Sequence, residues 1–291
     1  MIRRLSPALA PALVLLAAAC ATIDGAVPTT RPGAAPATSS SATTFSATTA
    51  PGIEVLRVFD GDTILVSREG AEQEVRLLGI NAPEQDECFG AEAREAAEAL
   101  IAAGPLRLEI QDEPDQFGRL LAYAWAGDTL LNLALVADGF ALALQGDHPR
   151  LAEFLRADER AYTGGIGLWA ADACGTPSSA PVTLLQVEFD PAGPDEDDLN
   201  GEWALLGNLA DQDADLTGWT LRDESSEHRY AFPPGTLLRP GEQVAVHAGC
   251  GDDAPGDLYW CQDGPVWNNG GDTALLLDPR GNVAGRLRYS G

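Results

Sequence analysis

The hydrophobic pattern of this 291-residue chain changes near Pro177–Pro181, and that change limits what the chain can fold into. Before it, strand-like alternation is mixed with helical periodicity; after it, only short strand-like runs remain, separated by glycine- and proline-rich turns. The two patterns predict two domains with separate cores. We place the first at residues 53–175, a linker at 176–181 and the second at residues 182–291.

The first domain has the pattern of an α+β fold. Three strand-like runs come first, then an alanine-rich helix that Gly104-Pro105 ends, then two further strands and two helices. The strands before the first helix are expected at Ile53–Phe59, Ile64–Ser67 and Glu74–Leu78. The helices are expected at Ala91–Ala103, Leu130–Asp138 and Pro149–Tyr162.

The second domain has the pattern of an all-β fold. Its short strand-like runs are separated by turn signals such as Pro233-Pro234-Gly235, which is typical of a β-sandwich. The strands are expected at Val182–Phe189, Glu202–Asn208, Trp219–Arg222, Tyr230–Phe232, Gln243–Ala248 and Thr273–Leu277.

The N-terminal segment has the features of an export signal. Arg3 and Arg4 precede an apolar run, Leu5–Ala19, that is too short to span a bilayer comfortably. Small residues directly before Cys20 resemble the lipobox of bacterial lipoproteins, which predicts a signal peptide at 1–20 and a lipid on Cys20; an ordinary secretory signal is the alternative. Residues 21–52 are mostly Ala, Thr, Ser and Pro, so we expect a disordered tether.

The cysteine count fits an oxidising compartment. Four cysteines remain after Cys20, and an even number in an exported protein predicts two disulfides. Three pairings are possible, and the domain division favours Cys88–Cys174 and Cys250–Cys261. The rival is a zinc site that combines His247 with Cys250 and Cys261, but no Cys-x-x-Cys pair and no fourth ligand support it.

The charge of the chain excludes one class of function. It has 44 acidic residues against 18 basic ones, all of them arginine. Such a surface argues against a protein that coats nucleic acid non-specifically, and it slows the encounter with any polyanion. Both domains are acidic, with nine arginines against 23 acidic residues in 53–172 and six against 20 in 181–291, so the charge is not a tail.

Three motifs in the first domain indicate phosphodiester chemistry when they are taken together. The turn Asp60-Gly61-Asp62-Thr63 offers carboxylates to a hard divalent cation, although Asp-Gly alone also forms hairpin turns. Segment 76–84 (RLLGINAPE) and segment 115–123 (DQFGRLLAY) each add an arginine. Hydrolysis of a phosphodiester needs an activated water and neutralisation of the phosphate charge, which these residue types can supply.

The order and spacing of these motifs, followed by Gly167-Leu168-Trp169, resemble the thermonuclease (staphylococcal nuclease-like) family over residues 53–172. The resemblance implies a five-stranded OB-fold barrel with three helices. It implies Ca²⁺ as the cofactor, bound by Asp62, Asn81 and the backbone carbonyl of Ala82, with Asp60 beside the metal. It also implies Glu84 as the general base and Arg76 and Arg119 as the groups that grip the phosphate.

Three departures from the family pattern bear on the expected site. Asn81 stands where the family usually has aspartate, which removes a negative charge and predicts weaker calcium binding that Asn81→Asp would tighten. Gln145 stands near the position of the family's usual tyrosine, which puts base stacking at that position in doubt. Ala82 replaces a common threonine, a mild change because the expected ligand is the backbone.

The second domain resembles a lamin-tail domain. The resemblance implies an immunoglobulin-like sandwich that attaches the protein to a ligand of the cell envelope or contacts the substrate. The residues that carry it are Asn200–Trp203, Leu216–Asp223, Tyr230–Thr236, Leu238–Glu242 and Trp267–Asp272.

Two hypotheses about function follow. The first is a monomeric, exported and lipid-anchored calcium-dependent nuclease that acts on DNA and also on RNA. The second is a catalytically weakened nuclease-fold protein that binds an envelope polymer, which Asn81 and the acidity of the chain favour. A glycosidase that uses Asp62 and Glu84 would leave Arg76 and Arg119 unexplained.

Overall fold

The computed structural model describes residues 45–48 and 53–291. The predicted signal peptide, Cys20 and most of the predicted tether lie outside the described residues. Among the residues that are described, no helix is both long and apolar enough to cross a membrane.

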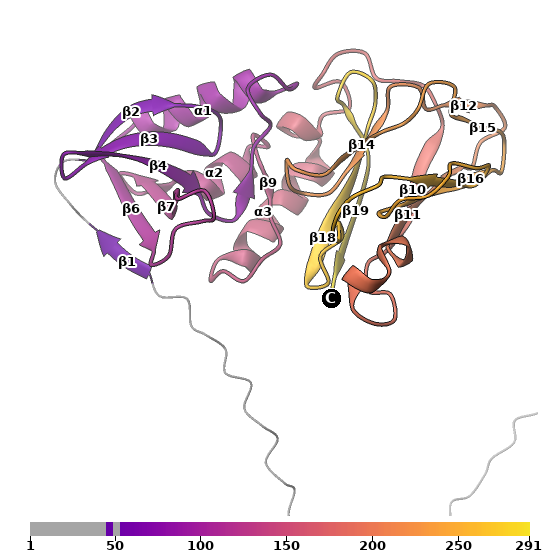
Figure 1. The fold of residues 1–291 in the computed structure, drawn as a ribbon. Helices are drawn as coiled ribbons and strands as arrows, with labels where there is room; N and C mark the ends of the chain where they lie inside the picture. Colours follow the sequence, from indigo (N-terminus) through magenta and orange to yellow (C-terminus); the bar gives the residue numbers. More distant parts are fainter. Residues whose placement is uncertain (1–44, 49–52) are drawn as a thin grey trace, which may run out of the picture. The chain divides into compact units, whose positions relative to one another are not determined.

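The N-terminal domain is built on one mixed sheet (Figure 1). Strands β2, β3 and β4 form an antiparallel meander, β4 pairs in parallel with β7, and β7 pairs antiparallel with β6. The first three strands and the helix that follows were predicted closely. The strands are β2 (Glu54–Val58), β3 (Thr63–Arg68), β4 (Ala71–Leu77), β6 (Leu106–Gln111), β7 (Leu120–Ala126) and β8 (Thr129–Leu130), with β5 (Ile80–Asn81) and β9 (Leu142–Ala143) as a separate pair.

Three α-helices are present in residues 53–291, and all three were predicted. They are α1 (Gly90–Ala102), α2 (Leu131–Ala137) and α3 (Leu151–Gly164). Helix α2 contacts both α1 and α3, as well as β7. Alternate strand positions such as Ile64, Val75 and Leu108 meet Leu135 of α2 and Phe154 of α3 in one core in which these side chains are at most 1% exposed. Burial of this apolar face stabilises the domain and fixes the strand register.

The predicted closed barrel is not found. Hydrogen-bonded pairs among the described residues give the strand order β1-β6-β7-β4-β3-β2 with two edges, β1 and β2. Strand β1 (Phe45–Thr48) comes from the segment that we expected to be entirely disordered, and it pairs antiparallel with β6. The tether prediction was therefore wrong for these four residues, because the exposed edge of β6 offers unpaired backbone groups that a neighbouring segment can satisfy. The two outer strands, β1 and β2, are not paired with each other, so the sheet stays open.

The C-terminal domain contains two four-stranded sheets and one two-stranded sheet within residues 182–291 (Figure 1). The sheet orders are β10-β11-β16-β17 and β14-β13-β18-β19, with β12 paired to β15. Residues of both larger sheets, such as Leu206 and Leu221, share one buried core with Trp219. Trp260 and Trp267 are 8% and 1% exposed and belong to this core.

The bounds of the remaining elements complete the description. The strands are β10 (Val182–Glu188), β11 (Trp203–Asn208), β12 (Ala214–Asp215), β13 (Thr220–Arg222), β14 (Arg229–Ala231), β15 (Leu237–Leu238), β16 (Gln243–His247), β17 (Asp257–Tyr259), β18 (Gly271–Leu277) and β19 (Val283–Ser290). Single turns of 3₁₀-helix are η1 (Gly167–Trp169), η2 (Asp195–Asp197) and η3 (Leu199–Gly201).

The two domains are in direct contact. Asp158 of α3 is fully buried and forms ion pairs with Arg286 and Arg288 of β19, at 2.9 and 2.7 Å. A small apolar cluster that includes Leu142 and Trp169 of one domain and Leu275 of the other lies nearby. The domains therefore pack through buried charges and apolar side chains as well as through the linker.

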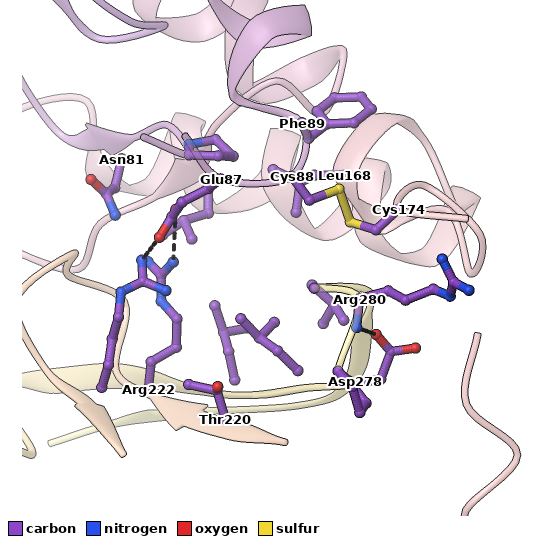
Figure 2. A pocket seen from close by; sticks show the side chains of 18 of the residues that line it. Asn81, Glu87, Cys88, Phe89, Leu168, Cys174, Thr220, Arg222, Asp278 and Arg280 are labelled. Atoms are coloured by element: carbon purple, nitrogen blue, oxygen red, sulfur yellow. Dashed lines mark hydrogen bonds and ion pairs between the residues drawn. A yellow bond between two sulfur atoms is a disulfide. The ribbon is translucent and has the colours of Figure 1, made fainter. Parts of the chain in front are cut away.

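Glu87, before α1, makes a second set of contacts to the C-terminal domain. Its carboxylate pairs with Arg229 and lies 4.0 Å from Arg222. Figure 2 shows Glu87 and Arg222 pointing toward one another beside a cavity of about 280 Å³, with the Cys88–Cys174 disulfide on its far side.

Candidate functional site

The predicted site residues of the N-terminal domain come together around one cleft of about 570 Å³. This volume is in the range of sites that hold small molecules or single units of a polymer. Six of the predicted side chains line it: Asp60, Asp62, Arg76, Asn81, Glu84 and Arg119.

Asp62 is the buried carboxylate of the cleft. It lies directly before β3 and is 4% exposed, and both of its carboxylate oxygens have partners. Oδ1 lies 3.1 Å from Arg76 and accepts the Thr63 hydroxyl at 2.9 Å, while Oδ2 accepts the backbone N–H of Ala82 at 2.5 Å. Burial raises the pKa of this carboxyl to about 7, although Arg76 opposes the rise.

Asn81 ends the two-residue strand β5 and is 3% exposed. Its Oδ1 accepts a hydrogen bond from Arg76 Nη2 at 3.0 Å, and its Nδ2 donates to the backbone carbonyl of Glu224 at 3.0 Å. One guanidinium therefore bridges the side-chain oxygens of Asp62, in the turn before β3, and Asn81, at the end of β5.

Asp60 shapes the turn next to Asp62. Its Oδ1 accepts the backbone N–H groups of Asp62 and Thr63, at 2.8 and 2.7 Å. This is the Asx pattern that stabilises turns. Gly61 between them allows close packing, because a Cβ there would lie 2.7 Å from Cβ of Ala82.

The two arginines are held in different ways. Arg76, on β4, points inward and donates to the backbone carbonyl of Leu77 as well as to Asp62 and Asn81. Arg119, just before β7, is fixed by its ion pair with Asp115 at 2.7 Å and lies over the ring of Phe117. Burial acts to raise the pKa of Asp115, but hydrogen bonds from Arg119 outweigh it and bring that pKa below its usual value.

Glu84 is exposed and lines the open side of the cleft. It lies in the turn before α1, where its carbonyl accepts the N–H of Glu87 and its own N–H donates to the Glu87 carboxylate at 3.1 Å. The first residue of α1, Gly90, is packed so closely that a Cβ there would lie 1.9 Å from the Glu84 carbonyl oxygen. The turn and the start of α1 together set the position of Glu84.

The oxygen atoms of the cleft suit a hard cation. Within residues 53–291, no three His, Cys, Asp or Glu side chains are grouped as a metal site. The expected ligands are of another kind, namely one carboxylate, one amide oxygen and one backbone carbonyl, from Asp62, Asn81 and Ala82. The first two already gather around a positive guanidinium, as oxygens that hold a cation would.

The C-terminal domain contributes part of the cleft, which the sequence analysis did not predict. Ser225, Ser226 and Glu227 line it together with the predicted residues. Gln145, which stands near the family's tyrosine position, is taken up by the domain contact: its N–H donates to Glu224 Oε1 and its side chain donates to the Tyr289 carbonyl at 2.9 Å. No local sequence signal reveals contacts that join residues so far apart in the chain.

The two predicted disulfides are confirmed in residues 53–291. Cys88 pairs with Cys174 and Cys250 with Cys261, with Cα–Cα distances of 5.7 and 3.9 Å. The alternative zinc site is wrong, since both of its cysteines are consumed and His247 bonds the Asn200 carbonyl and Asp257 instead.

Both domains match known protein families. The family model described as "Staphylococcal nuclease homologue" matches residues 74–171, and the model described as "Lamin Tail Domain" matches residues 176–291. The micrococcal nuclease of Shigella flexneri is 35% identical over 132 residues, which cover 40% of this chain and 72% of that protein. Protein ParB of Escherichia coli is 34% identical over 128 residues, which cover 40% of this chain and 71% of that protein.

A staphylococcal relative aligns over a shorter stretch. The thermonuclease of Staphylococcus intermedius is 38% identical over 96 residues, or 31% of this chain, and the alignment spans 57% of its own length. The two family models match consecutive parts of the chain, in the order of the two domains along the sequence. The chain belongs to the staphylococcal nuclease homologues and carries a lamin tail domain after its nuclease-like domain.

Proposed function

We propose that this protein is a calcium-dependent nuclease that hydrolyses phosphodiester bonds of DNA and also of RNA. The observation that carries the proposal is the single cleft in which Asp62, Asn81, Glu84 and two arginines meet. The relatives named thermonuclease and micrococcal nuclease support it.

Arg76, Glu84, Arg119 and the expected calcium ligands each have a role in this reaction. Arg119, held by Asp115, binds the phosphate of the scissile bond, and Arg76 neutralises charge that develops on it. Glu84 accepts a proton from a water molecule whose oxygen attacks phosphorus, and the bond from phosphorus to the leaving oxygen breaks as that oxygen takes up a proton from solvent water. Calcium bound by Asp62, Asn81 and the Ala82 carbonyl would add positive charge beside the phosphate.

The test is hydrolysis of labelled single- and double-stranded DNA and of RNA by the intact chain, in calcium and in chelator. We expect cleavage in calcium, none in chelator, and loss of calcium binding by titration calorimetry in Asp62→Asn. Cleavage that is unchanged in chelator would contradict the calcium site, and no cleavage with any divalent cation would contradict the nuclease.

A binding protein without turnover is the second candidate. The inward position of Arg76, whose guanidinium contacts Asp62, Asn81 and the Leu77 carbonyl, is the observation that favours it. The two candidates differ in one result: the binding protein retains labelled DNA in calcium without shortening it.

We also propose that the protein is exported and anchored by a lipid on Cys20. The sequence Leu16-Ala17-Ala18-Ala19-Cys20 supports this, and two disulfides suit an oxidising compartment. Mass spectrometry of the mature N-terminus should find a lipidated Cys20; an unmodified Cys20 within a longer chain would contradict the anchor.

For the C-terminal domain we propose the immunoglobulin-like arrangement that the lamin-tail resemblance implies, and attachment to an envelope ligand in a monomeric protein. Two facing sheets around a shared core support the arrangement. Sedimentation of the intact chain as one species at the mass of a monomer tests the monomeric state.

A further inference from the structure

One loop of the lamin tail domain forms part of the nuclease cleft. This 223–228 loop, Asp223–His228, joins β13 to β14, and its residues Ser225, Ser226 and Glu227 line the cleft together with Asp62, Arg76 and Arg119. We propose that the loop is a wall of the substrate cleft and that Glu227 determines how strongly the cleft holds the phosphodiester chain of a nucleic acid. The inference rests on the proposed function, because it concerns the same site.

The loop is fixed to the nuclease domain from two sides. The Glu224 backbone carbonyl accepts the amide of buried Asn81 at 3.0 Å, and the Glu224 carboxylate accepts the backbone N–H of Gln145. These contacts join the loop to the end of β5 and to the segment just after β9 in the nuclease domain. Asn81 and Glu224 are each 3% exposed, so their hydrogen bond is shielded from water. It holds the loop beside the cleft.

The loop is also rigid in itself. The Asp223 carboxylate accepts the N–H and the hydroxyl of Ser225, at 3.0 and 2.8 Å, and pairs with His228 at 2.8 Å. Arg222, which is 6% exposed, donates to the backbone carbonyls of Asp223 and Ser225 and faces Glu87 of the nuclease domain (Figure 2). A loop tied at this many points presents a fixed wall to a ligand.

Glu227 places a negative charge on the side of the cleft that binds phosphate. Its side chain is exposed, and it lines both the main cleft and an adjoining hollow of about 280 Å³ whose other residues include Asp115, Phe117 and Arg119. A nucleic-acid chain that contacts Arg119 therefore enters hollows that this carboxylate also lines. Like charges at such a position weaken the binding of the polyanion, and salt screens the effect.

The experiment measures Kd for a fluorescent oligodeoxynucleotide by anisotropy, in chelator and at low ionic strength, with the intact chain. Glu227→Gln and Glu227→Lys are compared with Glu196→Gln and Glu196→Lys, which change an exposed acidic residue of the same domain that does not line the cleft. We expect Kd to fall about threefold for Glu227→Gln and about tenfold for Glu227→Lys, with less gain at high salt. The Glu196 variants should stay within about twofold of the wild type.

Equal effects of the Glu227 and Glu196 variants would overturn the proposal, and so would binding that is equally weak in all five proteins. The readout needs no cleavage. Failure of the wild type to cleave DNA in calcium would therefore count against the proposed function alone, while the Kd values still decide the role of Glu227.

Discussion

At the scale of single residues, the structure of the cleft depends on a few buried polar atoms that have defined hydrogen-bond partners. Asn81 shows this best, because its amide oxygen faces Arg76 and its amide nitrogen faces the Glu224 carbonyl. An aspartate at this position would supply more charge to a cation, but it would also point an acceptor at a carbonyl oxygen. The residue therefore serves the domain contact as well as the expected metal site.

We predict that Asn81→Asp destabilises the protein by about 1–3 kcal/mol without calcium, since a buried acceptor loses its donor. Calcium should then raise the melting temperature of this variant more than that of the wild type, because the site gains a negative charge. Thermal unfolding with calcium and with chelator measures both effects. Asn200→Asp is the control, since it removes a similar amide-to-carbonyl bond at an exposed position; an equal calcium shift there would refute the assignment of Asn81.

Glu202 of the lamin tail domain gives a prediction about pH. Burial raises the pKa of this carboxyl, although it accepts the backbone N–H groups of Val266 and Trp267. A raised pKa in the folded state means that its contribution to stability is complete below about pH 4.5, the ordinary value, and is lost as the pH rises through the folded-state pKa. Glu202→Gln should therefore flatten the fall of the melting temperature as the pH rises above about 4.5. An unchanged slope in the variant would contradict this account.

At the scale of elements, the three helices and the strands β2 to β4 follow closely from the sequence, while several strands of the C-terminal domain and the pairing of strands do not. Helix α1 begins within one residue of the predicted start, because an alanine-rich run with Gly104-Pro105 after it permits little else. Strand β19 was missed because Val283–Ser290 alternates arginines with small and apolar residues and pairs with β18 along a half-buried edge. Strand β1 was missed because its segment folds only against the edge of β6.

The turn before α1 depends on a glycine, and we predict that Gly90→Ala disturbs Glu84. The new Cβ would lie 1.9 Å from the Glu84 carbonyl oxygen and 2.8 Å from its carbonyl carbon, both backbone atoms that cannot yield without moving the turn. We expect a loss of about 1–3 kcal/mol in the free energy of unfolding and at least a tenfold loss of kcat, because the expected base shifts. Gly146→Ala, where a Cβ would meet nothing within 4 Å, should change neither. Full activity of Gly90→Ala would disprove the role of this turn.

At the scale of the whole molecule, the two domains act as one folded body from residue 53 onward, held by buried charges. The two domain families in their order and both disulfides could be predicted from the sequence, because each depends on local patterns or on counting. The contact between the domains could not be predicted. Asp158 lies about 130 positions before Arg286 and Arg288, and all three look like ordinary surface charges in the sequence. The same holds for the 223–228 loop, whose role follows only from its place beside Asn81.

We predict that Asp158→Asn weakens the domain contact strongly. Removing this fully buried charge leaves Arg288 without its ion-pair partner and leaves Arg286 paired with the exposed Glu159 alone. The free energy of unfolding should fall by about 3 kcal/mol. Glu159→Gln, which changes the neighbouring exposed charge, should cost less than about 0.5 kcal/mol. Urea unfolding of both variants measures the difference, and equal stabilities would contradict the proposed importance of the buried pair.

The central claim is that this cleft hydrolyses phosphodiesters with Glu84 as the base. The most direct measurement is the initial rate of cleavage of a labelled oligonucleotide in calcium by the intact chain, with Glu84→Gln and Glu95→Gln side by side. Both substitutions remove one exposed carboxylate, but only Glu84 lines the cleft. We predict that Glu84→Gln lowers kcat by about 10²–10⁴-fold, as expected for loss of a general base, and that Glu95→Gln keeps the wild-type rate. Equal rates for the two variants would contradict the account.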